Sequence, residues 1–179
     1  MKVAILVAEG FEEIETSVTY DVLKRAGIEV LTAGLKPGPI TGSRGLRIVC
    51  DIVVDELKAS ALDALIIPGG YPGYVNLGKS PVVLNLIRTM ASAGKDLASI
   101  CAGPLVLEQA GVIKGKTVTC FPGTESSLKT ARFSPQRVIE DGNIITSRGP
   151  GTAMDFALKL VERWAGYETA GKIRKELVV

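Results

Sequence analysis

The chain has 179 residues, of which 46% are hydrophobic and 22% are charged, a composition typical of one folded domain with a complete core. Its net charge is +2, and its basic residues are scattered without interleaved aromatic side chains, so we expect no binding to nucleic acid. Its apolar runs are only long enough for strands, and its first residues lead directly into one, so we expect neither a membrane span nor a signal peptide.

The pattern alternates between apolar segments typical of buried strands and amphipathic segments typical of helices. In the first part of the chain, we expect a strand at Lys2–Ala8, a helix at Ile14–Ala26, a strand at Ile28–Ala33, a hairpin or edge excursion within Pro37–Val54 and a short helix at Asp55–Ala61. A strand at Asp63–Ile67, a helix at Pro81–Ala93, a strand at Leu97–Ile100 and a helix reaching Gln109 are expected next. The last part should contain strands at Thr117–Phe121, Val138–Glu140 and Ile144–Ser147, and helices at Gly149–Trp164 and Tyr167–Glu176. Gly27 and Gly111 suit helix C-termini, and Ser80 followed by Pro81 suits a helix start.

Continuous apolar strands that alternate with helices predict an α/β fold with a mainly parallel sheet covered on both faces. Ligands of such folds bind beyond the carboxyl ends of the strands. The loops expected there are residues 9–15, 68–76, 101–104, 121–127 and 148–152. No repeat or linker interrupts the pattern, so we expect a single domain over residues 1–179.

Cys101 is the strongest candidate for chemistry. It ends the apolar run Leu97–Ile100 and precedes the small-residue turn Ala102-Gly103-Pro104, which is the pattern of a nucleophile elbow with Cys in place of Ser. At such a corner the N–H of Ala102 can donate to an oxyanion, and the following helix start favours thiolate, so we expect the pKa of Cys101 to lie below that of free cysteine. The alternative is a buried structural cysteine, but the corner favours a functional one.

The chain contains no histidine, so no Cys-His dyad can form, and we do not expect a Cys-His protease. Glu15 is the candidate partner of the thiol, because it lies one position round from the apolar face of Ile14 and Val18 and can turn toward the strand ends. Burial and a nearby thiolate both raise the pKa of a carboxyl group. We therefore expect Glu15 to hold a proton and donate it to the thiolate or to a sulfur oxyacid, whereas Glu12 and Glu13 need only a capping role.

Two glycine-containing turns are further candidates. Pro68-Gly69-Gly70 follows a strand, and Gly70 can expose an N–H opposite that of Ala102, although a simple tight turn explains the pattern equally well. The loop at residues 147–152 precedes a helix and lacks the Lys of a phosphate loop. We interpret it as a turn and helix cap, with Arg148 as a candidate anion contact.

The three cysteines, Cys50, Cys101 and Cys120, are too few and too widely spaced for a disulfide framework or a zinc site. We therefore expect no metal, no cofactor, and a reducing, cytoplasmic compartment. Cys50 and Cys120 end apolar segments and are expected to react slowly, which leaves Cys101 as the reactive thiol.

Five segments together resemble the ThiJ/PfpI superfamily, in particular its parkinsonism-associated DJ-one branch and its YajL-like bacterial members. They are Glu9–Glu15, Asp21–Gly27, Ile67–Gly70, Ile100–Pro104 and Thr146–Thr152, and the resemblance extends over nearly the whole chain. It implies a flavodoxin-like (Rossmann-like) three-layer α/β/α sandwich in one ThiJ/PfpI domain, similar to the class I glutamine amidotransferases. It also implies Cys101 as nucleophile, Glu15 as its hydrogen-bond partner, and N–H groups of Gly70 and Ala102 at an oxyanion site.

The resemblance further implies a homodimer, with the first helix and the loop at Ser43-Arg44 near the partner subunit. A helix face with Tyr20, Asp21 and Arg25 mixes aromatic and charged groups as interfaces do, and Arg44 is a candidate dimer or anion contact.

Two positions depart from related members. Ala102 stands where protease-like members have a His after the cysteine, and Phe121 stands where the parkinsonism-associated branch often has a His before the proline. Peptidase chemistry and His-assisted proton transfer are therefore not expected.

Two functions follow from the resemblance. The first is a cysteine-dependent, glutathione-independent glyoxalase or protein deglycase that acts on methylglyoxal, glyoxal or their protein adducts, with a role in oxidative stress. The alternative is a redox-sensing protein or chaperone whose Cys101 is oxidised to a sulfinate without significant turnover. An inactive scaffold with an unreactive cysteine is a third interpretation.

Overall fold

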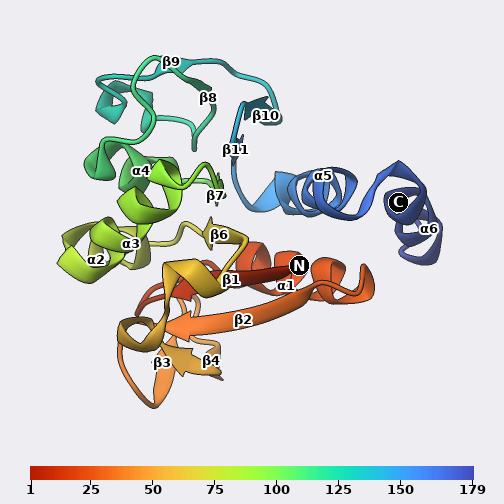
Figure 1. Ribbon diagram of the computed structural model, residues 1–179, viewed down its shortest axis with the longest axis horizontal. Helices are drawn as coiled ribbons and strands as arrows, with labels where there is room; N and C mark the ends of the chain where they lie inside the picture. The colour runs from red at the N-terminus through yellow and green to blue at the C-terminus, as the bar shows by residue number, and fades with distance from the viewer.

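The computed structural model describes all 179 residues, and a seven-stranded sheet forms its centre (Figure 1). The strands are, in chain order, β1 (Lys2–Val7), β2 (Glu29–Gly34), β5 (Ile52–Val53), β6 (Ala64–Ile67), β7 (Asp96–Ile100), β10 (Val138–Asp141) and β11 (Ile144–Ser147). Their order across the sheet is β10-β11-β7-β6-β1-β2-β5. Every neighbouring pair is parallel except β10 with β11, which confirms the prediction of a mainly parallel sheet.

Five of these strands define the topology. When β1, β2, β6, β7 and β11 are taken as first to fifth, their order across the sheet is 2-1-3-4-5, the flavodoxin-like arrangement. The strand order reverses between β1 and β6, and ligands of such folds bind beyond the carboxyl ends of the strands at this point. The topology therefore directs attention to the loops that follow β1 and β6.

The helices form two layers, one on each side of the sheet. The first layer contains α1 (Glu13–Arg25), α5 (Ala153–Ala165) and α6 (Tyr167–Glu176), and the second contains α2 (Gly73–Lys79), α3 (Pro81–Ser92) and α4 (Pro104–Ala110). Figure 1 shows α2, α3 and α4 grouped together, with α5 and α6 at the opposite end of the view. The expected three-layer sandwich is confirmed. None of the helices is both long enough and apolar enough to span a bilayer.

The hydrophobic core is formed where the apolar residues of the strands and helices recur at the spacing that the sequence pattern predicted. In β1, residues 3–7 are all fully buried, because the strand lies inside the sheet between β2 and β6 and is covered on both faces. On α3, the buried residues Val83, Ile87 and Met90 recur at helical spacing and face the sheet. The predicted start of this helix is confirmed, since the Ser80 hydroxyl accepts a hydrogen bond from the N–H of Val83 at 3.3 Å.

Two small sheets stand apart from the central one. Strands β3 (Pro39–Thr41) and β4 (Arg47–Val49) form an antiparallel hairpin, which confirms the β structure expected within Pro37–Val54. Strands β8 (Thr117–Val118) and β9 (Arg132–Phe133) form a short parallel pair. The strand expected at Thr117–Phe121 ends early, at Val118. The next N–H, that of Thr119, donates to the Thr146 hydroxyl at 2.9 Å, and the N–H of Phe121 donates to the carbonyl of Cys101 at 2.8 Å.

Three local predictions need correction. The helix expected at Asp55–Ala61 is wrong, since the segment forms two separate 3-10 turns, Val54–Glu56 and Ala59–Ala61. Leu57 and Lys58, between the two turns, have extended backbone with ψ of 131° and 118°, so the segment cannot form one continuous helix. The predicted loop at residues 68–76 contains the start of α2, which its glycines and prolines concealed. The helix expected from Gly149 opens with the 3-10 turn Pro150–Thr152 and becomes regular at α5.

Candidate active site

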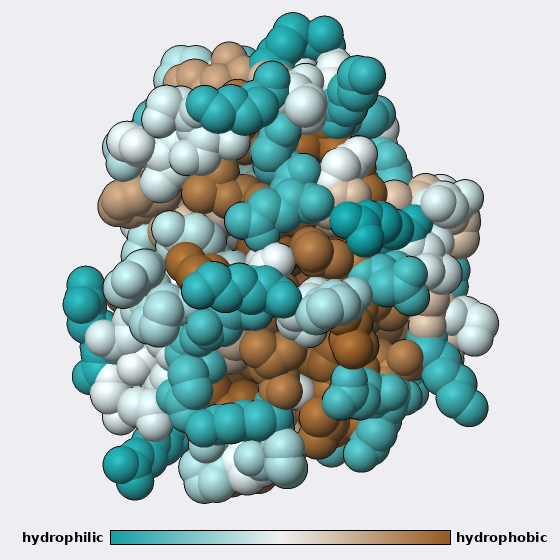
Figure 2. All heavy atoms as spheres, turned by 90° about the vertical axis from the view of Figure 1, so that its left-hand side faces the viewer, coloured by the Kyte–Doolittle hydropathy of each residue, from teal (hydrophilic) through white to brown (hydrophobic).

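The candidate site lies at the carboxyl ends of β6 and β7. In Figure 1 the β2 arrow points to the left of the view, and β1, β6 and β7 run parallel to it, so their carboxyl ends lie on that side. Figure 2 faces this side and shows hydrophobic atoms between hydrophilic side chains. A cavity of about 610 Å³ is found here, lined by Glu12, Ser43, Arg44, Gly70, Tyr71, Tyr74, Cys101, Ala102, Phe121, Thr124 and Pro150.

Cys101 sits in a strained backbone conformation between β7 and α4. Its φ is 63°, and Val178, near the C-terminus, is the only other non-glycine residue with a positive φ. The N–H of Cys101 donates to the carbonyl of Ser147 at 2.9 Å, and its carbonyl accepts from Phe121. The backbone is thus held from two sides in the strand–turn–helix corner that the sequence predicted.

Glu15 reaches the same place from the first turn of α1. Its side chain is fully buried, and Oε2 accepts a hydrogen bond from the N–H of Gly69 at 2.8 Å. Oε1 is buried without a hydrogen-bond partner. Glu12 caps the helix as expected, because its carboxylate accepts from the N–H of Glu15 at 2.7 Å. The helix start therefore directs one carboxyl to the cap and the other into the site.

The electrostatics of Glu15 and Cys101 are coupled. Burial raises the pKa of Glu15 to about 7, although the hydrogen bond from the Gly69 N–H and the nearby Cys101 thiol act in the opposite direction. Burial also raises the pKa of the Cys101 thiol, and the charge of Glu15 raises it further. The N–H groups of Ala102 and Gly70 favour the thiolate without outweighing these effects.

These directions confirm one expectation and correct two others. The pKa of Glu15 is raised, as the sequence predicted. The prediction that the pKa of Cys101 lies below that of free cysteine is wrong, because the elbow buries the sulfur and places it next to the Glu15 carboxyl group. In the resting site the carboxyl group of Glu15 therefore loses its proton before the thiol does, and the expectation that Glu15 holds the proton and donates it to a thiolate is wrong.

The turn at Pro68-Gly69-Gly70 lies against the sulfur. A Cβ atom on Gly69 would lie 2.8 Å from the Cys101 Sγ, too close for any side chain. Gly70 has a φ of +92°, and a Cβ there would lie 2.3 Å from the backbone nitrogen of Glu12. The two glycines thus let the backbone approach Cys101, and the N–H of Gly70 acts on the sulfur together with that of Ala102.

The two candidate arginines differ in their placement. Arg44 lines the cavity, and its loop is held by Glu13, whose carboxylate accepts from the Arg44 N–H at 2.5 Å and from the Ser43 hydroxyl at 3.0 Å. Arg148 does not line the cavity. Its guanidinium lies over the Phe133 ring, with Cζ 5.6 Å from the centroid.

The loop around Arg148 satisfies its own polar groups. The N–H of Gly149 donates to the Thr152 hydroxyl at 3.1 Å, and that hydroxyl also contacts the Ser147 hydroxyl at 2.7 Å. The interpretation of this loop as a turn and helix cap therefore agrees with its geometry.

Several lining residues were not identified from the sequence as site residues. Tyr71 and Tyr74 were not considered, and Phe121 was considered only because it replaces a histidine. Aromatic residues make up only 5% of the chain, so their place in loops that follow strands is a signal that could have identified them. Gly69 was also missed as the donor that orients Glu15.

Comparisons with known proteins agree with this architecture. The model of the DJ-1/PfpI family matches residues 1–163. A glutathione-independent glyoxalase of Caenorhabditis elegans is 39% identical over 97% of this chain and 93% of its own length. A deglycase of Pyrococcus abyssi is 40% identical over 84% of this chain and 92% of its own length.

A solved structure supports the same assignment. The crystal structure of Drosophila melanogaster DJ-1beta has a TM-score of 0.96 and 40% sequence identity, and the match covers 99% of this chain and 97% of that chain. The chain therefore belongs to the DJ-1/PfpI family.

Proposed function

We propose that the protein is a cysteine-dependent glyoxalase or deglycase that acts on glyoxal, methylglyoxal or their protein adducts. The observation that carries the proposal is the pairing of Cys101, at a strained elbow beside two backbone N–H groups, with a buried carboxyl whose pKa is about 7. Two relatives with the names glyoxalase and deglycase support it.

The first step uses Glu15 as a base. The thiol has a raised pKa, so it needs a proton acceptor at the moment of attack, and a carboxylate with a pKa of about 7 is suited to that role near neutral pH. The sulfur forms a bond with the aldehyde carbon while the thiol proton moves to Glu15. Negative charge develops on the carbonyl oxygen, and the N–H groups of Gly70 and Ala102 stabilise it.

The second step returns the proton and completes the reaction. Glu15 protonates the oxyanion to give a hemithioacetal and becomes a carboxylate again. It then moves the proton on the former aldehyde carbon to the neighbouring ketone carbon, while the hydroxyl proton of the hemithioacetal moves to the ketone oxygen. This gives a thioester of lactate when the substrate is methylglyoxal. Water hydrolyses the thioester, so that methylglyoxal and water become lactate and the thiol is regenerated.

The test measures lactate formed from methylglyoxal by the purified protein and its variants. We expect Cys101→Ser and Glu15→Gln each to lower kcat by at least about a hundredfold, the contribution usual for a nucleophile or proton-transfer group. Cys50→Ser is the matched control, because Cys50 lies outside the cavity, and it should retain the wild-type rate. Wild-type rates in both site variants would disprove the mechanism.

A redox sensor or chaperone is the second candidate function. The observation that supports it is the environment of the sulfur, because Cys101 is only 8% exposed. The sulfur lies next to the Glu15 carboxyl, which is protonated below about pH 7, and next to two backbone N–H groups. These donors would hold the two oxygens of a sulfinate. Titration with peroxide, read by intact mass, distinguishes the functions. A selective gain of two oxygens at Cys101, with negligible lactate formation, would favour sensing.

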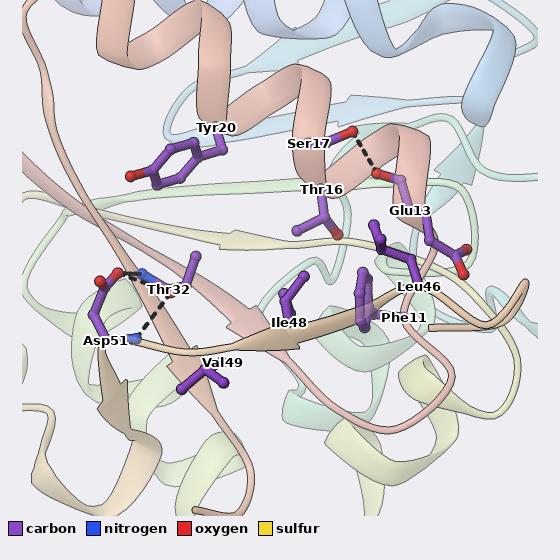
Figure 3. Close-up of a pocket in the computed structure, with 10 residues that line it drawn as sticks. All are labelled: Phe11, Glu13, Thr16, Ser17, Tyr20, Thr32, Leu46, Ile48, Val49 and Asp51. Carbon is purple, nitrogen blue, oxygen red and sulfur yellow. Dashed lines mark hydrogen bonds between the residues drawn. The ribbon is translucent and has the colours of Figure 1, made fainter. Parts of the chain in front are cut away.

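We further propose a homodimer formed through the groove between α1 and the β3–β4 hairpin (Figure 3). The groove has a volume of about 270 Å³, and Tyr20 of α1 lines one wall. Leu46 and Val49 of the hairpin are 50% and 73% exposed, a large apolar exposure for residues of a folded monomer.

The other helix residues expected at the interface face elsewhere. Arg25 pairs with Asp21 at 2.7 Å and with Glu176 at 2.6 Å, both within the chain, so these charges are satisfied without a partner. Arg44 lies on the connection between β3 and β4. A second subunit on the hairpin would therefore lie next to a loop that lines the active site.

We also propose that the protein works in a reducing, cytoplasmic compartment. Its three cysteines are all free, and its site depends on an unoxidised Cys101 thiol.

A further inference from the structure

Three aromatic side chains line the cavity that contains Cys101. They are Tyr71, Tyr74 and Phe121, in a chain with an aromatic content of 5%. Tyr71 is 74% exposed and Phe121 is 42% exposed, so their rings are not buried in the hydrophobic core and can contact a ligand. The centroids of Tyr71 and Tyr74 are 6.5 Å apart with their planes at 54°, a tilted pair of the kind that aromatic rings prefer.

The backbone fixes the rings relative to the reacting sulfur. The N–H of Tyr74 donates to the carbonyl of Gly70 at 3.0 Å, and Gly70 supplies one of the N–H groups at Cys101. The N–H of Phe121 donates to the carbonyl of Cys101 itself at 2.8 Å. Aromatic residues from two segments, the start of α2 and the loop after β8, are thus attached to the backbone that positions the nucleophile.

The cavity is far larger than the small dicarbonyls require. Its volume of about 610 Å³ lies in the range of sites that hold drug-sized ligands, whereas the apolar part of methylglyoxal is a single methyl group. Exposed ring faces gain free energy when a flat apolar group covers them. Glu12 and Arg44 contribute opposite charges to the lining, so its net charge selects neither an anionic nor a cationic substituent.

We propose that the preferred substrates are 2-oxoaldehydes with an aromatic or similarly large apolar group on the ketone carbon. This inference rests on the proposed glyoxalase chemistry and specifies its substrate class. With phenylglyoxal as the probe, substrate and water give mandelate. The aldehyde carbon is oxidised to the carboxylate and the ketone carbon is reduced to the carbinol, so no external oxidant or reductant is needed.

The experiment compares kcat/KM for mandelate formation from phenylglyoxal with kcat/KM for lactate formation from methylglyoxal. Product formation is measured rather than substrate loss, because dicarbonyls also modify arginine side chains. We expect the wild-type protein to prefer phenylglyoxal. The ratio of the two constants should fall by roughly fivefold in Tyr74→Leu and in Phe121→Leu, which is the effect of about 1 kcal/mol for one aromatic contact.

Matched variants separate ring contact from general damage. Tyr74→Phe and Phe121→Tyr keep the ring and should keep the ratio. Tyr167→Leu removes a tyrosine that is 75% exposed on α6 and should also leave the ratio unchanged. Comparison of each variant with the wild type cancels the difference in intrinsic reactivity between the two aldehydes.

The outcomes distinguish the two proposals. Lactate formation without a preference for phenylglyoxal, or a ratio that survives loss of the rings, would overturn the substrate inference and leave the glyoxalase proposal intact. Absence of both products would overturn both.

Discussion

At the scale of single residues, the burial of the Glu15 carboxyl has a cost in stability. Its pKa is about 7 in the folded protein because of burial, whereas in the unfolded chain it loses its proton near the ordinary value of 4.5. Between these values the folded state binds more protons, so the stability contributed by this group falls as pH rises. We expect Glu15→Gln to raise the free energy of unfolding at pH 8 by at most about 3 kcal/mol, and to have little effect near pH 4. Urea titrations at both pH values check this.

The neighbouring Glu13 provides a control with the opposite sign. Burial raises its pKa, but hydrogen bonds from the Arg44 backbone and the Ser43 hydroxyl lower it more, so the net shift is downward. Glu13→Gln should therefore lower the free energy of unfolding at pH 8. An equal effect of Glu15→Gln at both pH values would contradict the assignment of a raised pKa.

At the scale of elements, α3 tests how far a local signal stabilises the fold. The Ser80 hydroxyl satisfies the N–H of Val83, which otherwise has no partner in the first turn. We expect Ser80→Ala to lower the free energy of unfolding by about 1 kcal/mol. Ser92→Ala, at the exposed end of the same helix, should change it by less than about 0.5 kcal/mol. Chemical denaturation measures both, and equal effects would show that the cap contributes nothing specific.

At the scale of the whole molecule, the exposed groove between α1 and the β3–β4 hairpin predicts association (Figure 3). We expect light scattering at micromolar concentration to give twice the chain mass of 18.9 kDa. Val49→Asp places a charge in the groove and should shift the protein toward monomer, because an unpaired charge is costly to bury. Val82→Asp, at a 44% exposed position on α3, is the matched control. A monomer mass for the wild type would contradict the homodimer.

The sequence alone was sufficient where the signal is local. The alternation of strands and helices follows from short-range periodicity, and β1 and α3 have the expected burial because their apolar spacing matches their geometry. The corner at Cys101 was visible because its strand, turn and helix are contiguous in the chain. Glu15 was also named from the sequence, but the apolar face used for it is wrong, because Ile14 is 51% exposed. The buried residues of α1 are Glu15, Thr16, Thr19, Val22 and Leu23. The resemblance to a known family indicated the same residue.

Only the tertiary structure decided what depends on groups distant in sequence. The pKa of Cys101 is raised because burial and the charge of Glu15 outweigh the helix start, and no local pattern contains that balance. The segment at residues 55–61 is not one helix because its backbone is extended at Leu57 and Lys58, and the distant Lys95 donates to the Ala59 carbonyl that follows this break. Tyr74 and Phe121 reach one cavity only when β6 and β8 are placed in space. Capping and periodicity act over a few residues, whereas desolvation, charge coupling and cavity shape are set by the packing of the whole chain.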